Sequence, residues 1–267
     1  MVNKEITSVQ NPLIKEILLL QEKSRARKRS ATFIIEGKRE ISLALKGNYE
    51  LIHVLICESI FDISSLNIFD FDITKIIKIS KDVYQKIAHR SSTEGIIAVA
   101  NWKDLDLQHI VFKSKAPLIL VAEAPEKPGN IGALLRTADA ANLDAVLIAN
   151  PKTDMYNPNI IRSSVGCLFT NQIATGTTTD ILNFLKGQHI KIYCADLKSA
   201  EPYYNIDYAG ASAIVVGTEA TGLSSEWLKN ADKNCIIPMQ GQIDSLNVSV
   251  SASIIIFEAQ RQRIFKL

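Results

Sequence analysis

Residues 241–263 read GQIDSLNVSVSASIIIFEAQRQR, and they decide how the C-terminal part of the chain folds. Between residues 247 and 256, apolar and polar side chains nearly alternate, which is typical of a β-strand. Leu246, Val250, Ile254 and Phe257 are instead spaced like one face of an α-helix. These residues alone leave both interpretations open. They also do not explain why a compact polar loop, 240–245, leads directly into so apolar a segment.

Upstream of this stretch, residues 116–240 alternate short apolar runs with amphipathic segments. We expect strands at PLILVAE, DAVLIAN, IKIYCAD, SAIVVG and NCIIPM, and helices over 131–142, 157–169 and 179–188. Continuous runs of Ile, Val and Leu separated by helices predict an α/β fold with a parallel sheet covered on both faces. Ligands of such sheets bind at the carboxyl ends of the strands.

The first part of the chain predicts a smaller α/β unit, since 267 residues exceed one typical core. A helix over 11–31, with Asn11 as its cap and Pro12 at its first position, precedes strands at ATFIIEG, LIHVLIC, TKIIKIS and GIIAVANW. Further helices are expected over 39–48 and 81–88. The predicted domains are residues 1–102 and 116–267, joined by a linker over 103–115.

The composition is that of an ordinary soluble globular protein, with 47% hydrophobic and 22% charged residues. No apolar run is long enough to span a bilayer, and the polar N-terminus does not read as a secretory signal. The four cysteines are far apart and suit small buried side chains in a reducing compartment, so we expect a cytoplasmic protein with no membrane contact. Neither these cysteines nor the four scattered histidines predict a metal site.

The charge is uneven along the chain. Residues 1–115 carry 18 basic and 14 acidic side chains, whereas residues 116–267 carry 12 and 14. The densest cluster is the run KSRARKRS, which contains Lys23, Arg25, Arg27, Lys28 and Arg29. By itself such a run is either a solvated helix end or a patch that contacts phosphate groups.

Three of the predicted strands end in unusual loops. In the first loop, Asn130 follows a Pro-Gly pair and is predicted to cap the helix that carries Arg136. In the second, Gly217 and Gly222 bound a turn, but Leu223 stands where a phosphate-binding P-loop requires Lys. No GxGxxG follows any strand, so a dinucleotide-binding half is not supported. Together with the loop at 240–245, these segments predict a composite site on one edge of the sheet.

NIGALLRTA, VVGTEATGL and IPMQGQIDSLNVSVSA closely resemble, in order, the three motifs of the SpoU (TrmH-like) family. Members are S-adenosylmethionine-dependent RNA ribose 2′-O-methyltransferases of the SPOUT superfamily. The resemblance covers about residues 117–263. The segments ITSVQNP, FIIEGKRE and GIIAVA also resemble, more loosely, the small L30e-like RNA-binding domain that precedes the catalytic domain in many members.

The resemblance implies an α/β domain whose C-terminal segment forms a trefoil knot around the cofactor. The IPM strand and the SLN loop would belong to this knot. The apolar segment after them would be a helix over 246–263 that locks the knot and packs against a second subunit. The resemblance therefore favours helix over strand, and it implies a homodimer with S-adenosylmethionine as cofactor and RNA as partner.

The resemblance also assigns residues to the site. Backbone groups of Gly217, Ile237 and Leu246 would hold the adenosine part, with Thr218 and Met239 as neighbours. The residues expected around the reacting ribose are Asn130, Arg136, Glu219, Ser245 and Asn247. Glu219 and Asn130 would orient the arginine, while Ser245 and Asn247 would shape the methyl-transfer pocket.

Arg136 has two possible roles on this interpretation. A guanidinium grips phosphate in a bidentate manner and would position the 2′-hydroxyl, whereas its very high intrinsic pKa makes the alternative role of general base demanding. Within this family the run KSRARKRS becomes a predicted RNA-contacting patch.

We therefore expect methylation of a ribose 2′-oxygen in ribosomal RNA, in particular 23S RNA, with transfer RNA as an alternative substrate. An RNA-binding protein that kept the fold without catalysis, or a nucleotide-dependent enzyme on a doubly wound sheet, are the competing functions. Intact motif residues argue against the first of these, and the missing phosphate-loop glycines argue against the second.

Overall fold

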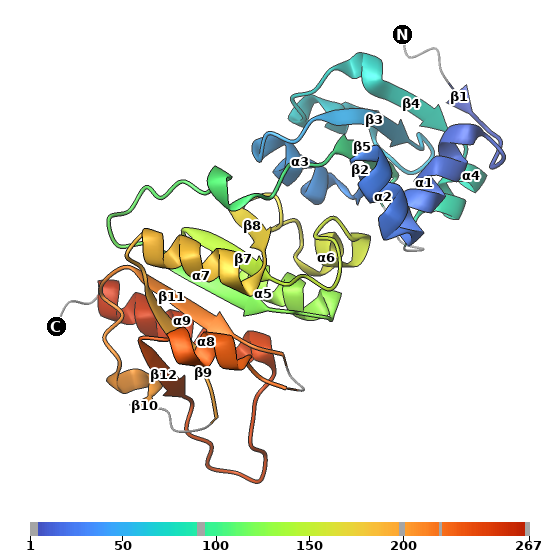
Figure 1. The fold of residues 1–267 in the computed structure, drawn as a ribbon. Coiled ribbons are helices and arrows are strands. Elements are labelled where there is room, and N and C mark those ends of the chain that lie inside the picture. The colour runs from blue at the N-terminus through green and yellow to red at the C-terminus, as the bar shows by residue number, and fades with distance from the viewer. Residues whose placement is uncertain (1–4, 90–93, 198–200, 219–220, 265–267) are drawn as a thin grey trace. The chain divides into compact units, whose positions relative to one another are not determined.

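The structure is a computed structural model that describes residues 5–89, 94–197, 201–218 and 221–264 (Figure 1). By its internal contacts the chain divides into two units. The first contains Met1–Asp104 and Asp154–Thr170, and the second contains Leu105–Thr153 and Asn171–Leu267. Residues 154–170 thus group with the first unit, although they lie inside the expected second domain. The domain boundaries read from the sequence stay a prediction.

The first unit is built on a five-stranded sheet in the order β1-β4-β3-β5-β2. Its strands are β1 (Glu5–Ile6), β2 (Thr32–Glu36), β3 (Leu51–Ile56), β4 (Ile76–Ile79) and β5 (Ile96–Asn101). Its helices are α1 (Pro12–Glu22), α2 (Ser24–Ser30), α3 (Lys38–Lys46), α4 (Lys81–Ile87) and α6 (Pro158–Ser163). As predicted, Asn11 caps α1 by accepting a hydrogen bond from the Leu13 amide.

The prediction of a single helix over 11–31 is wrong, because the helix is interrupted at Lys23. Lys23 is extended, with φ −112° and ψ 111°, and it separates α1 from α2. The change of direction sends Arg27 into the interior, where only 2% of the residue is exposed. There its guanidinium donates to both carboxylate oxygens of Asp154, at 2.9 and 2.7 Å.

Aromatic stacking holds residues 154–170 within the first unit. The Tyr156 ring stacks on Phe33, with centroids 4.5 Å apart, and on Trp102 at 5.4 Å. The helix expected over 157–169 ends already at Ser163, because Val165 and Gly166 take positive φ values of 55° and 84°. A left-handed backbone cannot continue a right-handed helix.

The second unit confirms the predicted parallel sheet. Its seven strands pair in the order β10-β12-β9-β11-β6-β7-β8, and every described pair is parallel. The strands are β6 (Leu118–Glu123), β7 (Ala145–Ala149), β8 (Ile173–Gly176), β9 (Lys191–Ala195), β10 (Glu201–Pro202), β11 (Ser212–Val216) and β12 (Lys233–Ile236). The short strands β8 and β10 were not expected from the sequence. Short 3₁₀ turns are η1 (Ile63–Ile68) and η2 (Ile73–Lys75) in the first unit, and η3 (Leu107–His109) and η4 (Tyr203–Asn205) in the second.

Helices cover both faces of this sheet (Figure 1). They are α5 (Pro128–Ala140), α7 (Thr178–Gly187), α8 (Ser225–Asn230) and α9 (Val248–Ile264). Ile119 and Val121 of β6 share one core with Leu185 of α7 and Trp227 of α8. Helices α5 and α9 pack against each other. None of the described helices has the length and apolarity needed to cross a membrane.

Residues 248–264 form the helix α9, as the resemblance implied for residues 246–263. Its polar end explains how it is held in place. Arg263 donates to the carbonyl oxygens of Ala116, at 2.6 Å, and Tyr208, at 3.0 Å, and Gln262 donates to that of Ile206 at 2.9 Å. These carbonyls precede β6 and β11, so the QRQR end of the helix is fixed to loops beside the sheet.

Candidate functional site

Three segments at the carboxyl edge of the second unit's sheet carry the predicted residues. They are the turn after β6, the turn after β11 and the loop 237–247 after β12. Asn130 lies in the first turn of α5, but it does not cap this helix as predicted. The helix begins at Pro128, whose ring suits the first helical position, and the capping position is Lys127. The Asn130 amide oxygen instead accepts a hydrogen bond from Asn247 Nδ2 at 3.2 Å.

Asn247 joins the first and third motifs. Its side-chain oxygen accepts hydrogen bonds from the Ser249 amide, at 3.0 Å, and the Ser249 hydroxyl, at 2.6 Å, and so caps α9. Its amide nitrogen remains to donate to Asn130. One side chain thus fixes the start of α9 and ties it to the start of α5, two helices separated by more than 100 residues of chain.

Arg136 lies on the exposed surface of α5. Within the part of the chain that the structure describes, its guanidinium takes part in no hydrogen bond or ion pair. The expected orientation of Arg136 by Asn130 is therefore not seen there. Glu219, its other expected partner, lies outside the described residues. An exposed guanidinium of this kind can bind a phosphate with two parallel hydrogen bonds.

The turn after β11 depends on glycine at position 217. A Cβ atom on Gly217 would lie 2.5 Å from the Leu223 amide nitrogen, so no larger residue fits. Two backbone hydrogen bonds pair Thr218 with Gly222. The Thr218 amide donates to the Gly222 carbonyl oxygen at 3.2 Å, and the Gly222 amide donates to the Thr218 carbonyl oxygen at 3.1 Å. Gly217 and Thr218 are therefore held in a fixed geometry, although they lie in an irregular segment.

The loop after β12 has the features needed to hold a nucleoside. Ile237, Met239 and Leu246 are half-buried, while Ser245 is exposed and donates to Asp244 at 3.1 Å. Between residues 237 and 246, no backbone group hydrogen-bonds to another described backbone group. Free backbone donors and acceptors beside half-buried apolar side chains suit an adenine ring, which needs both. These residues therefore fit the adenosine part of S-adenosylmethionine.

Sequence reasoning missed Glu123, the last residue of β6. It is 7% exposed, and its two carboxylate oxygens accept from the Ser224 amide, at 2.8 Å, and the Thr178 hydroxyl, at 3.2 Å. The available signal was a carboxylate in register with Ile119 and Val121, which face the core. Glu123 links the strand before the first motif to the end of the second.

Nucleophilic cysteine or metal chemistry has no support in the described residues. Burial raises the pKa of the Cys235 thiol to about 11, so this side chain next to the loop 237–247 stays protonated at neutral pH. Burial also raises the pKa of Cys194. No group of three or more His, Cys, Asp or Glu side chains that could hold a metal is present in the described parts.

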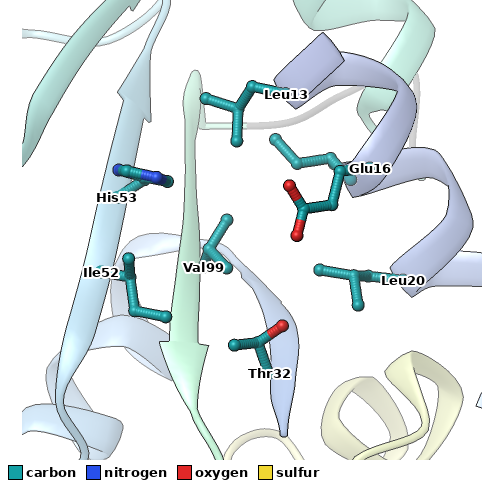
Figure 2. Close-up of a pocket in the computed structure, with 8 residues that line it drawn as sticks. Leu13, Glu16, Leu20, Thr32, Ile52, His53 and Val99 are labelled. Atoms are coloured by element: carbon teal, nitrogen blue, oxygen red, sulfur yellow. The ribbon is translucent and has the colours of Figure 1, made fainter. Parts of the chain in front are cut away.

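A small pocket lies in the first unit, between α1 and the sheet (Figure 2). Glu16, Thr32 and His53 contribute polar groups among the apolar side chains Leu13, Leu20 and Val99. Its volume of about 50 Å³ admits only a few water molecules, whereas pockets for small ligands measure roughly 300–1,000 Å³. This pocket is therefore not a cofactor site.

The basic run of the first unit is only partly exposed. Lys23, Arg25, Lys28 and Arg29 are exposed on or beside α2. Arg27 is not part of this surface, because it is buried in its ion pair with Asp154. The exposed patch therefore has four cations where the sequence suggested five.

Known proteins resemble this chain in both halves. Residues 117–257 match the SpoU rRNA Methylase family, and residues 11–98 match the MRM3-like substrate binding domain. The 23S rRNA (guanosine(2553)-2′-O)-methyltransferase RlmP of Bacillus subtilis is 29% identical over 95% of this chain and 98% of its own length.

Solved structures agree with these sequence matches. An RNA 2′-O ribose methyltransferase is 38% identical, with a TM-score of 0.83 over 98% of this chain and 100% of that one. The SpoU methyltransferase AviRb of Streptomyces viridochromogenes, in complex with AdoMet, is 25% identical, with a TM-score of 0.86 over 96% and 99%. The predicted fold class is confirmed, and the trefoil knot stays a prediction. The chain belongs to the SpoU rRNA methylase family.

Proposed function

We propose that this enzyme transfers the methyl group of S-adenosylmethionine to a ribose 2′-hydroxyl of 23S ribosomal RNA. The observation that carries the proposal is the hydrogen bond between Asn130 and Asn247, which joins the first and third motif segments beside a loop with free backbone groups. The relative RlmP, named for 23S RNA, matches almost the whole chain and thus both units.

The cofactor site proposed here consists of the backbone of Gly217, Ile237 and Leu246, with Thr218 and Met239 beside it. Bound S-adenosylmethionine supplies an electrophilic methyl group, so the chain has only to align the reactants and assist proton removal. The fixed turn at Gly217 and the half-buried side chains of Ile237, Met239 and Leu246 suit this task because a preformed site loses little entropy on binding. No metal is needed for this reaction.

Arg136 is proposed to grip a phosphate of the RNA next to the target ribose. Its exposed guanidinium has no protein partner among the described residues, which suits a substrate contact. A guanidinium is always charged in proteins, which makes it a poor proton acceptor at neutral pH. Asn130, Ser245 and Asn247 then shape the pocket around the ribose, and Glu219 is proposed to orient Arg136.

The first unit is proposed to bind RNA through Lys23, Arg25, Lys28 and Arg29. Four exposed cations on a seven-residue helix and its cap form a compact positive surface. Such a surface attracts any RNA phosphate backbone, so it adds affinity without adding sequence preference.

A second copy of the chain is proposed to pack on α9. Val250, Phe257 and Ile264 are 45%, 49% and 69% exposed and follow one another at seven-residue spacing. They therefore form one stripe, while Ala252, Ile255, Ile256 and Ala259 are buried in the chain's own core. Exposed apolar stripes on stable proteins are commonly contact surfaces, and we propose a homodimer. The cytoplasm is the proposed location, since all four cysteines are buried thiols outside any disulfide.

A methyl-transfer assay tests the proposal. Purified protein is incubated with tritiated S-adenosylmethionine and total unmodified RNA, the RNA is separated by size, and labelled nucleotides are mapped. Label at one ribose of 23S RNA is the expected result. Label in transfer RNA would keep the chemistry and change the substrate. Cofactor binding without any labelled RNA would contradict the proposed activity and favour an RNA-binding protein.

A further inference from the structure

Glu123 is a buried carboxylate that the proposed reaction does not use. Both of its oxygens are satisfied, by the Ser224 amide and by the Thr178 hydroxyl, yet no cation pairs with it among the described residues. Burying a carboxylate without a cation is costly, and hydrogen bonds to the carboxylate offset part of that cost. The question is which part of the molecule depends on them.

The two hydrogen bonds reach the starts of two helices. Thr178 is the first residue of α7, and Ser224 immediately precedes α8. Helix N-termini favour a negative charge, which explains how Glu123 is tolerated without a cation. Thr178 is held in turn by Asn150, whose amide donates to its hydroxyl at 2.9 Å. The Thr178 side of this network is therefore anchored twice.

The Ser224 side is different, because Ser224 lies two residues after Gly222 in the chain. Ser224 follows Leu223, which is 8% exposed, and Leu223 in turn follows Gly222, which pairs with Thr218. Glu123 ties Ser224 to the end of β6, next to Leu223, which is buried in the core of the sheet. Its backbone also leads into Ala124, which has a positive φ of 45°.

We propose that Glu123 is a positioning residue that, by holding Ser224, fixes the pair of Thr218 and Gly222 beside Gly217 and thereby sets the affinity for S-adenosylmethionine. The inference rests on the proposed function, which places cofactor contacts at Gly217 and Thr218. Glu123 touches neither cofactor nor RNA in this proposal. Its effect passes through the hydrogen bond to the Ser224 amide, so the length of the side chain, which lets it reach this amide, matters more than its charge.

Two matched variants separate reach from charge. Glu123→Asp keeps the charge but is one methylene shorter, so it loses the Ser224 contact. Glu123→Gln keeps the length, and its amide oxygen still accepts from Ser224 while its amide nitrogen donates to Thr178. We expect Glu123→Asp to raise the Kd for S-adenosylmethionine about tenfold, the size of effect of one lost hydrogen bond to a charged group. Glu123→Gln is expected to stay within about threefold of the wild type.

The measurements are calorimetric Kd values for S-adenosylmethionine and for RNA, together with kcat at saturating cofactor. A positioning role raises cofactor Kd and leaves RNA Kd and kcat unchanged, whereas a merely structural role lowers the melting temperature without this split. Thr178→Val is the control, because it removes the other hydrogen bond and leaves Ser224 in place. It is expected to bind the cofactor like the wild type.

The reverse order, with Glu123→Gln weak and Glu123→Asp normal, would overturn the proposal, as would normal cofactor binding in Glu123→Asp. Equal losses of cofactor and RNA binding in Glu123→Asp would also overturn it. If the wild type itself bound no S-adenosylmethionine, the proposed function would fail instead. The two failures are therefore distinguishable.

Discussion

Arg27 and Arg136 each lie on a helix, but the environments of their guanidinium groups are opposite. In the first unit, Arg27 is 2% exposed and bonds both oxygens of Asp154. At the carboxyl edge of the second unit's sheet, Arg136 is exposed and has no partner among the described residues. An arginine whose guanidinium is bonded to a carboxylate inside its own fold supports structure, whereas an exposed one without a protein partner is available to a substrate.

The largest expected effect comes from breaking the satisfied pair. Arg27→Ala leaves the Asp154 carboxylate buried without compensation, which costs about 3–5 kcal/mol of unfolding free energy. Urea titration measures it, with Trp102 reporting on the first unit and Trp227 on the second in single-tryptophan variants.

The double variant Arg27→Met with Asp154→Leu is the control. Replacing both charges by apolar side chains of similar size leaves nothing unpaired, so most of the stability should return. A loss of unfolding free energy that only Trp102 reports would show that the pair stabilises the first unit alone. A stable Arg27→Ala protein would show that the pair contributes little.

Arg136→Ala is expected to act on rate and not on stability. Loss of a phosphate contact that forms with the substrate should lower kcat/KM roughly a hundred- to a thousand-fold, or about 3–4 kcal/mol. The melting temperature should not change, because no described protein group depends on this side chain. Lys229→Ala, at an exposed cation of α8, is the matched control.

Arg136→Lys separates the two roles considered for this residue. Lysine cannot form the bidentate grip, so the phosphate role predicts a large loss with an unchanged pH profile. A general base at this position would instead show a pH profile shifted toward lower pH, since lysine titrates near 10.4. Nearly full activity in Arg136→Lys would contradict the bidentate grip.

The exposed stripe of α9 extends the comparison to apolar groups. Phe257 is 49% exposed, whereas its neighbour Ile256 is fully buried. If a second copy covers Phe257, Phe257→Asp should weaken dimerisation by roughly 2–3 kcal/mol, the value of burying such a side chain. Analytical ultracentrifugation across a concentration series measures it. Glu258→Gln, on the same helix but outside the stripe, should leave the association unchanged.

The Asn247 side chain has two functions: its oxygen caps α9, and its amide nitrogen donates to Asn130 at the proposed site. Asn247→Ala removes the cap of α9 and the link to Asn130, and should cost about 1–2 kcal/mol in stability. Asn247→Asp keeps an oxygen for the Ser249 amide but has no donor for Asn130. We therefore expect Asn247→Asp to retain the melting temperature and lose activity. Full activity in this variant would show that the Asn130 link is dispensable.

The sequence predicted much of this arrangement, and the reasons for the misses are physical. Strands of the parallel sheet follow from their continuous apolar runs, and Asn11 with Pro12 marks the start of α1. The helix α9 could not be decided from periodicity, since Arg263 and Gln262 hold it through carbonyls far away in sequence. Resemblance to a family decided it instead.

Other features depended on contacts that no local pattern carries. The burial of Arg27 requires Asp154, which lies 127 residues away, so KSRARKRS looked uniformly basic. Glu123 looked like the polar end of a strand, and only its bonds to Thr178 and Ser224 reveal its position in the site. The site residues came from motif order, and their roles stay predictions.

The smallest expected effect concerns the exposed remainder of the basic run. Arg25→Gln with Arg29→Gln removes two cations that are exposed on α2. The logarithm of the RNA association constant falls linearly with the logarithm of the salt concentration. Each lost phosphate contact should make this slope shallower by about 0.7–0.9. Lys81→Gln with Lys86→Gln changes the net charge of the same unit equally, but on α4. If both double variants changed the slope alike, overall charge and not the patch would govern binding. A smaller slope only in the α2 variant would show that RNA contacts the exposed cations of this helix. Arg27 lies on the same helix but is buried, so it would not take part in this contact.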